Sequence, residues 1–470
     1  MGINFGTDGW RGLIADEFTF ENVSRCTQGL ADYLIATQNT KGEILVGYDT
    51  RFLSEHFAQT VSKVLAGNGI TVKLANQPAP TPVISFNTMK RNAIGAVIIT
   101  ASHNPFNWNG LKIKMHYGGS PPEGTISILE KYISNIALVK TAPLSSSLIK
   151  SFDPQPPYLN HIGEFLNLSP IRNSQLNIIC DSMFGAGSGY LPSIVNGERA
   201  SVSEIRNSIN PIFPGMLQPE PILANLGQLR KLVIKQNADV GIAYDGDADR
   251  LGIVDEKGNY INASHVYSLL ALYLLEVRNM KGPIIKSITS SDMLLRLAEL
   301  YHVPIHETKI GFKNIGPVML ERDALIGGEE SGGYGYRGHI PERDGILSSL
   351  LFLDLMVKLG KSPSQLITYL HNKVGEHYYK RQDIQIDSEA KLNLAKDLIS
   401  NSNIVTVGKF KVLSSNNTDG LKLKFKEGWL AIRLSGTEPL LRIYAESNSL
   451  STTKYLVQNM SNLVDIKPGG

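Results

Sequence analysis

The sequence predicts an α/β protein in which three α/β domains with mixed sheets precede a smaller α+β domain at the C-terminus. The chain has 470 residues, which is more than one ordinary hydrophobic core accommodates. Strand-like and helix-like segments alternate through most of the sequence, as they do where helices cover a mostly parallel sheet. After about residue 375 the pattern changes to β-rich runs separated by short turns, which is typical of antiparallel pairing.

Residues 1–150 are expected to form the first domain. The runs "EILVGYD" (Glu43–Asp49) and "AIGAVIIT" (Ala93–Thr100) indicate buried strands, and Ser54–Leu65 has the periodicity of a helix. The stretch from 141 to 158 is rich in Ser and Pro, so we expect a linker there.

Two further α/β domains are expected at 151–258 and 259–374. In the earlier one, "QLNIICDSMFGAGSGYLPSIV" indicates a strand, a glycine turn and a helix, and "DVGIAYDGDADRLGIVDEKGNY" indicates two strands around an acidic loop. In the later one, a helical pattern at His265–Val277 precedes a strand at Gly282–Thr289 and a helix near Gly345–Leu359.

The last domain is expected at 375–470. Its β-rich runs are "LKLKF", "WLAIRL" and "LLRIYAE", and helical patterns at Ser388–Ile399 and Ser451–Val464 flank them. This combination predicts a small α+β domain with an antiparallel sheet.

The composition excludes several functional classes. Lys and Arg number 46 against 43 Asp and Glu, and no basic run with interleaved aromatics is present, so nucleic acid is not an expected partner. The longest apolar stretch, Val266–Leu275, is too short to span a bilayer, and the first residues do not resemble a signal peptide. The two cysteines, Cys26 and Cys180, favour a reducing compartment. We therefore expect a cytoplasmic protein without a membrane partner.

The acidic loop "YDGDADR" places Asp245, Asp247 and Asp249 at alternate positions after a buried strand. In an extended loop this spacing turns three carboxylates to one side, where they repel one another unless a cation lies among them. Carboxylate oxygens suit Mg²⁺ or Ca²⁺. An EF-hand is excluded because Arg250 stands where that loop needs Gly. The alternative is a solvated turn.

A second polar segment follows a buried strand in "VIITASHNPFNWNGLKIK". Ser102 lies at the strand's carboxyl end, where α/β proteins bind ligands. No G-x-S-x-G motif surrounds it, so a hydrolase triad is not indicated. Lys112 is a candidate proton donor or acceptor if a nearby cation lowers its pKa. His103 is a candidate for orienting the serine loop, and the alternative for Ser102 is a serine that caps a turn.

Two more loops carry candidate binding residues. "GGEESGGYGYRGHIPERDG" contains a formal G-x-G-x-x-G, but no helix follows it directly, so dinucleotide binding is excluded. Glu329 and Ser331 in this loop suit sugar hydroxyls; the alternative is a flexible surface loop. "RLSGTEPLLR" follows a strand in the last domain, and its Arg433, Ser435, Gly436 and Thr437 form a plausible site for a phosphate.

Taken together, "FGTDGWRG", "TASHNP", "DGDADR", "GEESGG" and "RLSGTEP", in this order, resemble the motifs of the α-D-phosphohexomutase family, and within it those of bacterial phosphoglucomutase/phosphomannomutase. The resemblance covers essentially the whole chain. It implies a heart-shaped protein of four domains around a central cleft, to which each domain contributes one loop. It also implies an isomerase that interconverts hexose 1-phosphates and hexose 6-phosphates, with glucose as the expected sugar, through a phosphoserine and a hexose 1,6-bisphosphate.

The resemblance also assigns roles to single residues. It implies a phosphoserine domain (1–150), a metal-binding domain (151–258), a sugar-binding domain (259–374) and a phosphate-binding domain (375–470). The implied Mg²⁺ ligands are phosphorylated Ser102, Asp245, Asp247 and Asp249. The catalytic candidates are Ser102, Lys112, Arg11 and His103. The substrate-binding candidates are Arg250, Lys309, Gly311, Glu329, Ser331, His339, Arg433, Ser435, Gly436, Thr437 and Arg442.

One departure from the family pattern concerns a histidine. Some relatives have His directly after Glu-x-Ser-Gly, where this chain has Gly333, and His339 in "GHIPERDG" is the candidate replacement. Other interpretations also stay open at this point: mannose or, less expected, glucosamine as the sugar, a metal-dependent phosphatase, and a sugar-phosphate sensor without catalysis. The protein is expected to be a monomer or a homodimer.

Overall fold

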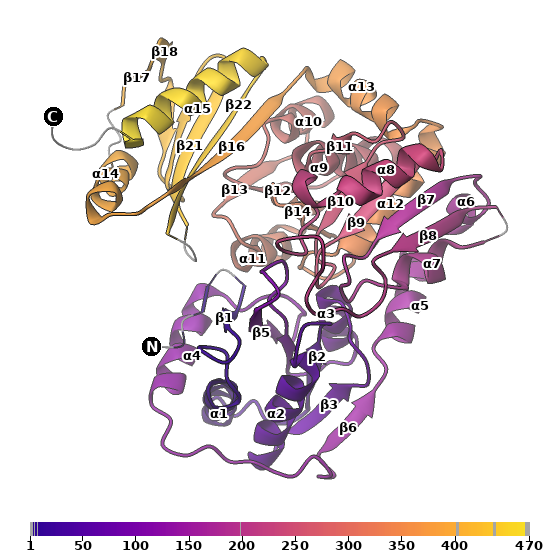
Figure 1. Ribbon diagram of the computed structural model, residues 1–470, viewed down its shortest axis with the longest axis vertical. Coiled ribbons are helices and arrows are strands. Elements are labelled where there is room, and N and C mark those ends of the chain that lie inside the picture. Colours follow the sequence, from indigo (N-terminus) through magenta and orange to yellow (C-terminus); the bar gives the residue numbers. More distant parts are fainter. Residues whose placement is uncertain are drawn as a thin grey trace.

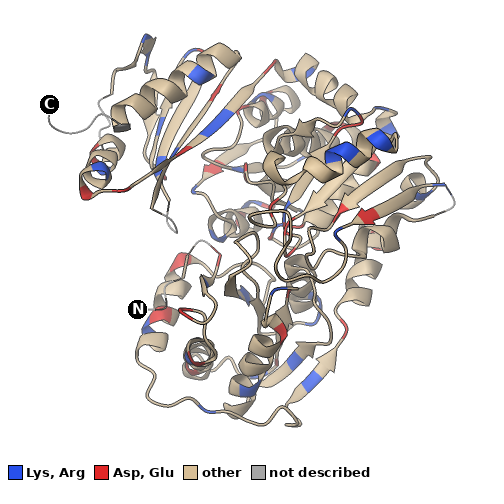
Figure 2. Cartoon of the chain, viewed as in Figure 1, with Lys and Arg blue, Asp and Glu red and all other residues tan. Residues whose placement is uncertain are grey.

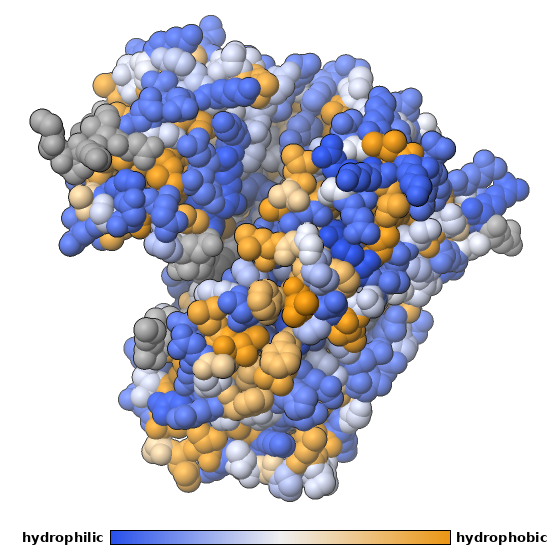
Figure 3. Space-filling view, viewed as in Figure 1, coloured by the Kyte–Doolittle hydropathy of each residue, from blue (hydrophilic) through white to orange (hydrophobic). Residues whose placement is uncertain are grey.

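A computed structural model of the chain describes residues 3, 5–6, 8–197, 199–400, 404–435 and 439–465. Among the described residues, four sheets of four or more strands, each with its own helices, follow one another along the chain, and we refer to them as domains I to IV; a two-stranded sheet, β17-β18, lies within domain IV (Figure 1). The surface is hollowed between the N-terminal and C-terminal domains (Figure 3). No helix among the described residues is both long enough and apolar enough to cross a membrane.

Domain I contains a six-stranded mixed sheet in the order β1-β5-β4-β2-β3-β6. Its strands are β1 (Trp10–Leu13), β2 (Glu43–Tyr48), β3 (Thr71–Ala75), β4 (Gly95–Ile99), β5 (Trp108–Met115) and β6 (Ile149–Phe152), and its helices are α1 (Phe20–Ala36), α2 (Ser54–Gly67), α3 (Thr81–Lys90) and α4 (Glu123–Ser134). The expected linker at 141–158 is therefore wrong in part, because β6 lies within it and pairs in parallel with β3.

Domain II contains a five-stranded mixed sheet in the order β11-β10-β9-β7-β8. Its elements are α5 (Gln155–Phe165), α6 (Ser169–Arg172), β7 (Asn177–Asp181), α7 (Tyr190–Val195), β8 (Ser201–Ile205), η1 (Leu223–Asn225), α8 (Gly227–Lys235), β9 (Val240–Tyr244), β10 (Leu251–Val254) and β11 (Tyr260–Ile261). Strand β9 is buried along its whole length, as its unbroken apolar sequence predicts.

Domain III contains a four-stranded sheet in the order β13-β12-β14-β15. Its elements are α9 (Ala263–Leu272), the π-helical turn η2 (Tyr273–Val277), β12 (Ile284–Ser287), α10 (Met293–Tyr301), β13 (Ile305–Thr308), α11 (Phe312–Arg322), β14 (Ile326–Gly328), β15 (Tyr334–Tyr336), α12 (Gly345–Leu359) and α13 (Pro363–Val374). Helix α12 is buried over most of its length, and its side chains belong to one hydrophobic core that domains II and III share. The same core also includes Val83 and Phe86 of α3, so domain I packs against it as well.

Domain IV contains a five-stranded antiparallel sheet in the order β16-β22-β21-β20-β19, which confirms the antiparallel pairing expected from the sequence. Its elements are β16 (Tyr378–Gln385), α14 (Glu389–Ser400), β17 (Thr406–Val407), β18 (Phe410–Lys411), β19 (Ser414–Asn416), β20 (Leu421–Lys424), β21 (Gly428–Leu434), β22 (Leu440–Ser447) and α15 (Leu450–Asp465). Its core is separate from those of the other domains.

The four candidate loops share one position relative to their sheets. Ser102 follows β4, Asp245 follows β9, Glu329 follows β14 and Ser435 follows β21, each at the strand's carboxyl end. In α/β proteins this end of the sheet is where ligands bind. Figure 2 shows acidic and basic residues intermixed at the centre of the molecule, where the loops of domains I, II and III meet.

Candidate active site

Ser102 is held in a strained backbone conformation next to the acidic loop. Its φ angle is 51°, in the left-handed region that a residue with a side chain seldom adopts, and the residue is buried. Its backbone N–H donates to Thr100 Oγ1 at 2.8 Å, and its carbonyl oxygen accepts from Arg51 Nη2 at 2.6 Å. The hydroxyl is thereby directed to domain II, where it donates to Asp245 Oδ2 at 2.8 Å.

The three aspartates of the acidic loop form one buried cluster. Each of Asp245, Asp247 and Asp249 offers a carboxylate oxygen, and these oxygens lie within 4.8 Å of one another. Burial, and then the charges of the other two aspartates, raise the pKa of Asp245 well above its usual value. Oδ1 of Asp247 and Oδ1 of Asp249 are buried and have no hydrogen-bond partner among the residues that the structure describes. Unpaired buried carboxylate oxygens of this kind fit a divalent cation such as Mg²⁺.

The acidic loop and the serine loop are in direct contact. A Cβ atom added to Gly246 would lie 2.4 Å from the Ser102 carbonyl oxygen, so only glycine permits this approach. On the other side of the loop, Thr81 at the start of α3 donates its backbone N–H to the Asp247 carbonyl oxygen at 3.0 Å and its hydroxyl to Asp247 Oδ2 at 2.5 Å. These contacts fix domain II against domain I at the site.

Lys112 lies on β5, and its ammonium group is enclosed by carboxylates. Nζ is 2.7 Å from Asp8 Oδ2, 2.8 Å from Asp247 Oδ2 and 3.2 Å from Asp249 Oδ2. Burial alone would lower the pKa of Lys112, but these three carboxylates outweigh burial and raise it. The lowered pKa considered from the sequence depends on a nearby cation and stays a prediction.

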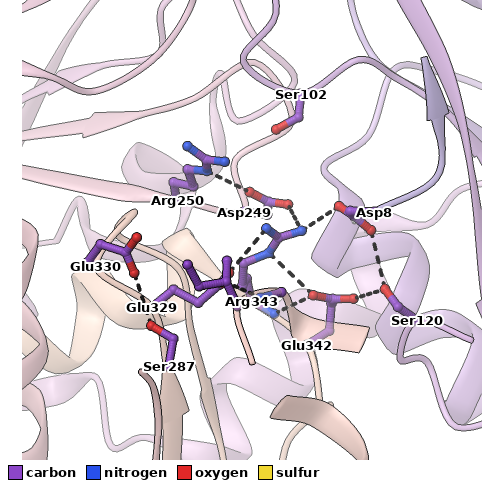
Figure 4. Close-up of polar contacts among 12 residues, drawn as sticks. Asp8, Ser102, Ser120, Asp249, Arg250, Ser287, Glu329, Glu330, Glu342 and Arg343 are labelled. Carbon is purple, nitrogen blue, oxygen red and sulfur yellow. Dashed lines mark hydrogen bonds and ion pairs between the residues drawn. The ribbon is translucent and has the colours of Figure 1, made fainter. Parts of the chain in front are cut away.

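Arg343 is a site residue that sequence reasoning missed. It precedes α12 and lies between the loops of three domains (Figure 4). Its Nη2 contacts Asp8 and lies 3.0 Å from Asp249 Oδ2, its Nη1 lies 3.7 Å from Glu329 Oε2, and its Nε lies 3.4 Å from Glu342 Oε1. One guanidinium group therefore joins carboxylates of domains I, II and III. The charged run "PERDG" beside the glycine-rich loop was the available signal.

Asp8 is the second residue that was missed, although it lies within the motif "FGTDGWRG". It accepts from Lys112, from Lys114 Nζ at 3.3 Å and from Arg343. Burial opposes ionisation of Asp8, but these three cations outweigh burial and hold its pKa well below the usual value. Lys114 also pairs with Glu342, and the Ser120 hydroxyl bonds the same Glu342 carboxylate, so the charged network continues behind the site (Figure 4).

Three further candidates surround Ser102. His103 Nδ1 lies 3.3 Å from Ser102 Oγ, and burial together with nearby arginines lowers the pKa of this histidine, which is therefore neutral. Arg11 donates to Asn104 Oδ1 at 2.5 Å. Arg250 pairs with Glu220 at 2.7 Å, and its Nε is 4.0 Å from Asp249 Oδ1. The structure thus brings all four catalytic candidates and Arg250 to one place.

Glu329 follows β14 and is buried. Its Oε1 accepts the backbone N–H of Gly311 at 2.6 Å, and Gly311 has a φ of 104°, which suits glycine. Burial raises the pKa of Glu329 to about 7, although Arg343 opposes this. Ser331 is half-buried nearby in the same loop, whereas the Lys309 side chain is exposed.

His339 does not lie with the other sugar-loop candidates. Its Nδ1 is 2.9 Å from His161 Nε2 on α5, and its Nε2 is 2.8 Å from Asp344 Oδ2. Its ring is stacked with those of Phe86 and His161 at centroid distances of 6.0 and 5.1 Å. The expectation that His339 takes the place of a substrate-contacting histidine therefore has no support, because these contacts hold it between domains I, II and III.

The last candidate loop lies in domain IV. Arg433 on β21 is directly opposite Arg442 on β22, and Arg433 Nε is 2.9 Å from Asp419 Oδ1. Arg442 Nε lies 3.9 Å from Asp383 Oδ2, so each of the two opposed guanidinium groups has a carboxylate neighbour. The backbone N–H of Ser435 donates to the Leu440 carbonyl oxygen at 2.8 Å. Gly436 and Thr437 lie outside the described residues.

Comparison with known proteins places this geometry in a family. The four domain families of phosphoglucomutase/phosphomannomutase match in order: α/β/α domain I at residues 2–140, α/β/α domain II at 156–258, α/β/α domain III at 262–374 and the C-terminal domain at 390–463. The chain belongs to the phosphoglucomutase/phosphomannomutase, or α-D-phosphohexomutase, family. It is accordingly a phosphohexomutase, an isomerase of sugar phosphates.

Individual relatives carry the names of different sugars. A phosphoglucomutase/phosphomannomutase of Thermococcus kodakarensis is 29% identical over 96% of this chain and 95% of its own length. A protein of Methanobrevibacter smithii, assigned as a phosphoglucosamine mutase, is 30% identical over 98% of both chains. A crystal structure of a Thermus thermophilus protein, assigned as a phosphomannomutase, is 32% identical, covers 99% of both chains and has a TM-score of 0.86.

Proposed function

We propose that this phosphohexomutase interconverts glucose 1-phosphate and glucose 6-phosphate through a phosphorylated Ser102 and glucose 1,6-bisphosphate. The observation that supports this most is the position of the Ser102 hydroxyl, 2.8 Å from Asp245 in a cluster of three buried aspartates. A hydroxyl held beside a cation site is suited to carry a phosphoryl group, because the cation offsets the charge of that group.

Asp245, Asp247 and Asp249 would hold Mg²⁺ together with the phosphate on Ser102. When bound, Mg²⁺ supplies positive charge to the phosphoryl oxygens and fixes their orientation. Hard oxygen ligands on three carboxylates favour Mg²⁺ over softer transition metals. The carboxylate oxygens of Asp247 and Asp249 that lack a hydrogen-bond partner among the described residues support this assignment.

The transfer itself requires positioning and charge more than covalent chemistry. As the sugar hydroxyl oxygen bonds to phosphorus, the bond between phosphorus and Ser102 Oγ breaks, and the proton of the sugar hydroxyl is transferred to Ser102 Oγ, which leaves as a hydroxyl group. Lys112, Arg11 and Arg250 contact residues of the serine loop and the acidic loop, and these three cations would stabilise the charge of the phosphoryl group during transfer. Arg343 would hold the loops of domains I, II and III at the distances that the transfer needs.

The other end of the substrate would bind in domain IV. Arg433 and Arg442, with Ser435, would hold the phosphate that does not react, and Glu329 with Ser331 would contact the sugar hydroxyls between the two ends. After the first transfer the bisphosphate has to turn round, so that its second phosphate reaches Ser102 and its first phosphate occupies the arginine pair. A single donor serine requires this reorientation.

Assays of sugar preference test the proposal. Glucose 1-phosphate, mannose 1-phosphate and glucosamine 1-phosphate are supplied separately, and formation of each 6-phosphate is measured beside release of inorganic phosphate. The proposal predicts the highest kcat/KM for glucose 1-phosphate and little inorganic phosphate. A higher kcat/KM for another sugar would contradict the choice of glucose, and phosphate release as fast as isomerisation would indicate a phosphatase instead.

A further inference from the structure

Asp419 in domain IV has two partners, and they belong to different domains. It lies in the turn between β19 and β20. Its Oδ1 accepts from Arg433 Nε at 2.9 Å within domain IV. Its Oδ2 accepts the backbone N–H of Ile310 at 2.9 Å, in the loop before α11 of domain III. Both carboxylate oxygens therefore accept a hydrogen bond, one from Arg433 in domain IV and one from the Ile310 backbone in domain III.

The turn that carries Asp419 is built for close approach. The next residue, Gly420, has a φ of 81°, and a Cβ atom there would lie 2.2 Å from the Ile432 carbonyl oxygen. Only glycine fits at this position without moving β21. Since Arg433 directly follows Ile432, the tight turn fixes the Asp419 carboxylate beside the Arg433 guanidinium group.

On the domain III side, two consecutive amides face carboxylates from different domains. The N–H of Ile310 donates to Asp419, and the N–H of Gly311 donates to Glu329 Oε1 at 2.6 Å. A movement of domain IV that breaks the first bond therefore acts on the loop that holds Glu329. The phosphate end and the sugar end of the site are joined through two adjacent peptide units.

We infer that Asp419 is a positioning residue, which orients Arg433 toward the substrate phosphate and couples the seating of domain IV to the position of Glu329. The inference rests on the proposed role of Arg433 as a phosphate anchor. Other contacts between these domains, such as Lys422 Nζ to Glu307 Oε1 at 2.7 Å, join domain IV to domain III without involving a candidate binding residue. Asp419 is distinguished from them because the oxygen that does not bond domain III accepts a hydrogen bond from Arg433.

The experiment compares Asp419→Ala and Asp419→Asn with a matched control, Asp387→Ala, which removes an exposed carboxylate of the same domain that pairs with Lys391. Steady-state kinetics give KM and kcat, hydrogen–deuterium exchange gives the protection of the Ile310 amide, and thermal melting confirms folding. Asp419→Ala is expected to raise KM by about tenfold or more, since charge-assisted bonds of this kind contribute about 1.5–3 kcal/mol, and to speed exchange at Ile310. The control should match the wild type.

The asparagine variant separates the two roles. Its amide oxygen can still accept from Ile310, whereas it loses the charge that pairs with Arg433, so KM should rise while the Ile310 amide stays protected. Wild-type KM in both Asp419 variants would overturn the inference, and so would unchanged exchange at Ile310 in Asp419→Ala. Arg433→Ala is measured beside them: an unchanged KM there would defeat the phosphate anchor itself, whereas a raised KM there with normal Asp419 variants would defeat only the role of Asp419.

Discussion

Ser102 and Asp245 come from different domains, yet the Ser102 hydroxyl donates a 2.8 Å hydrogen bond to an Asp245 carboxylate oxygen. The bond depends on the left-handed backbone of Ser102 and on the glycine that follows Asp245. The pairing shows how the fold brings together, from two loops that are more than a hundred residues apart, the residues of the proposed phosphoryl-transfer site.

Gly246→Ala should damage both stability and activity. The added methyl group would lie 2.4 Å from the Ser102 carbonyl oxygen, so the two loops must move apart. Overpacking of this kind costs about 1–3 kcal/mol of unfolding free energy, and displacement of Ser102 should lower kcat. Urea denaturation and steady-state kinetics measure the two effects. Gly227→Ala on α8 is the control, because the added group there meets open space; equal behaviour of the two variants would contradict the contact.

Removal of divalent cations should abolish activity, and Mg²⁺ should restore it. Neutralising one ligand by Asp247→Asn should weaken Mg²⁺ binding, since the site depends on carboxylate charge. Isothermal titration with Mg²⁺ measures binding independently of turnover. Asp239→Asn, which changes the aspartate just before β9 in the same domain, should bind Mg²⁺ as the wild type does. Chelator-resistant turnover would count against the cation site.

Glu329 should make stability depend on pH near neutrality. Its folded-state pKa is about 7 and its ordinary value is 4.5, so the folded protein favours the protonated form. This contribution is fully present below about pH 4.5 and is lost as the pH rises through about 7. Glu329→Gln resembles the protonated form and should lack the effect. Unfolding free energies of both proteins, measured across this range, should therefore diverge with rising pH, and parallel curves would refute the assignment.

His161 should make the protein sensitive to acid. Burial, together with His339, lowers its pKa to about 4, whereas an unfolded histidine titrates near 6.5. The unfolded state therefore binds a proton in this interval that the folded state does not, and stability falls as the pH falls from about 6.5 to about 4. Thermal melting of His161→Gln should show a weaker acid dependence than the wild type. His56→Gln, which changes an exposed histidine on α2, should keep the wild-type dependence.

Much of the fold and the two central loops could be predicted because their signals are local. The sequences "AIGAVIITASHN" and "DVGIAYDGDADR" each predict a buried strand that ends in a polar loop, and the structure contains both strands, β4 and β9. Strand β6 was missed because it is short, lies at the edge of the described sheet beside β3, and has two exposed residues between two half-buried ones. A strand with so little buried surface leaves no hydrophobic pattern to detect.

The residues that were missed or misplaced depend on contacts between domains. Arg343 and Asp8 come into contact only when domains I, II and III are packed together. In the sequence alone, neither residue can be distinguished from a charged residue on the surface. His339 was expected near the sugar as a replacement for the histidine that some relatives have in place of Gly333, whereas aromatic stacking on Phe86 of domain I holds it elsewhere. The pKa of Lys112 also depends on contacts between domains, because carboxylates of domains I and II raise it.

The most direct test of the account is whether a phosphoryl group resides on Ser102 during turnover. The protein is incubated with glucose 1,6-bisphosphate carrying isotopically labelled phosphate, its peptides are mapped by mass spectrometry, and the label is then chased with unlabelled glucose 1-phosphate. The account predicts label on Ser102 that moves to glucose 6-phosphate, no label in Ser102→Ala, and normal labelling in Ser127→Ala on α4. Label that passes between sugars without residing on Ser102, or that leaves as inorganic phosphate, would contradict it.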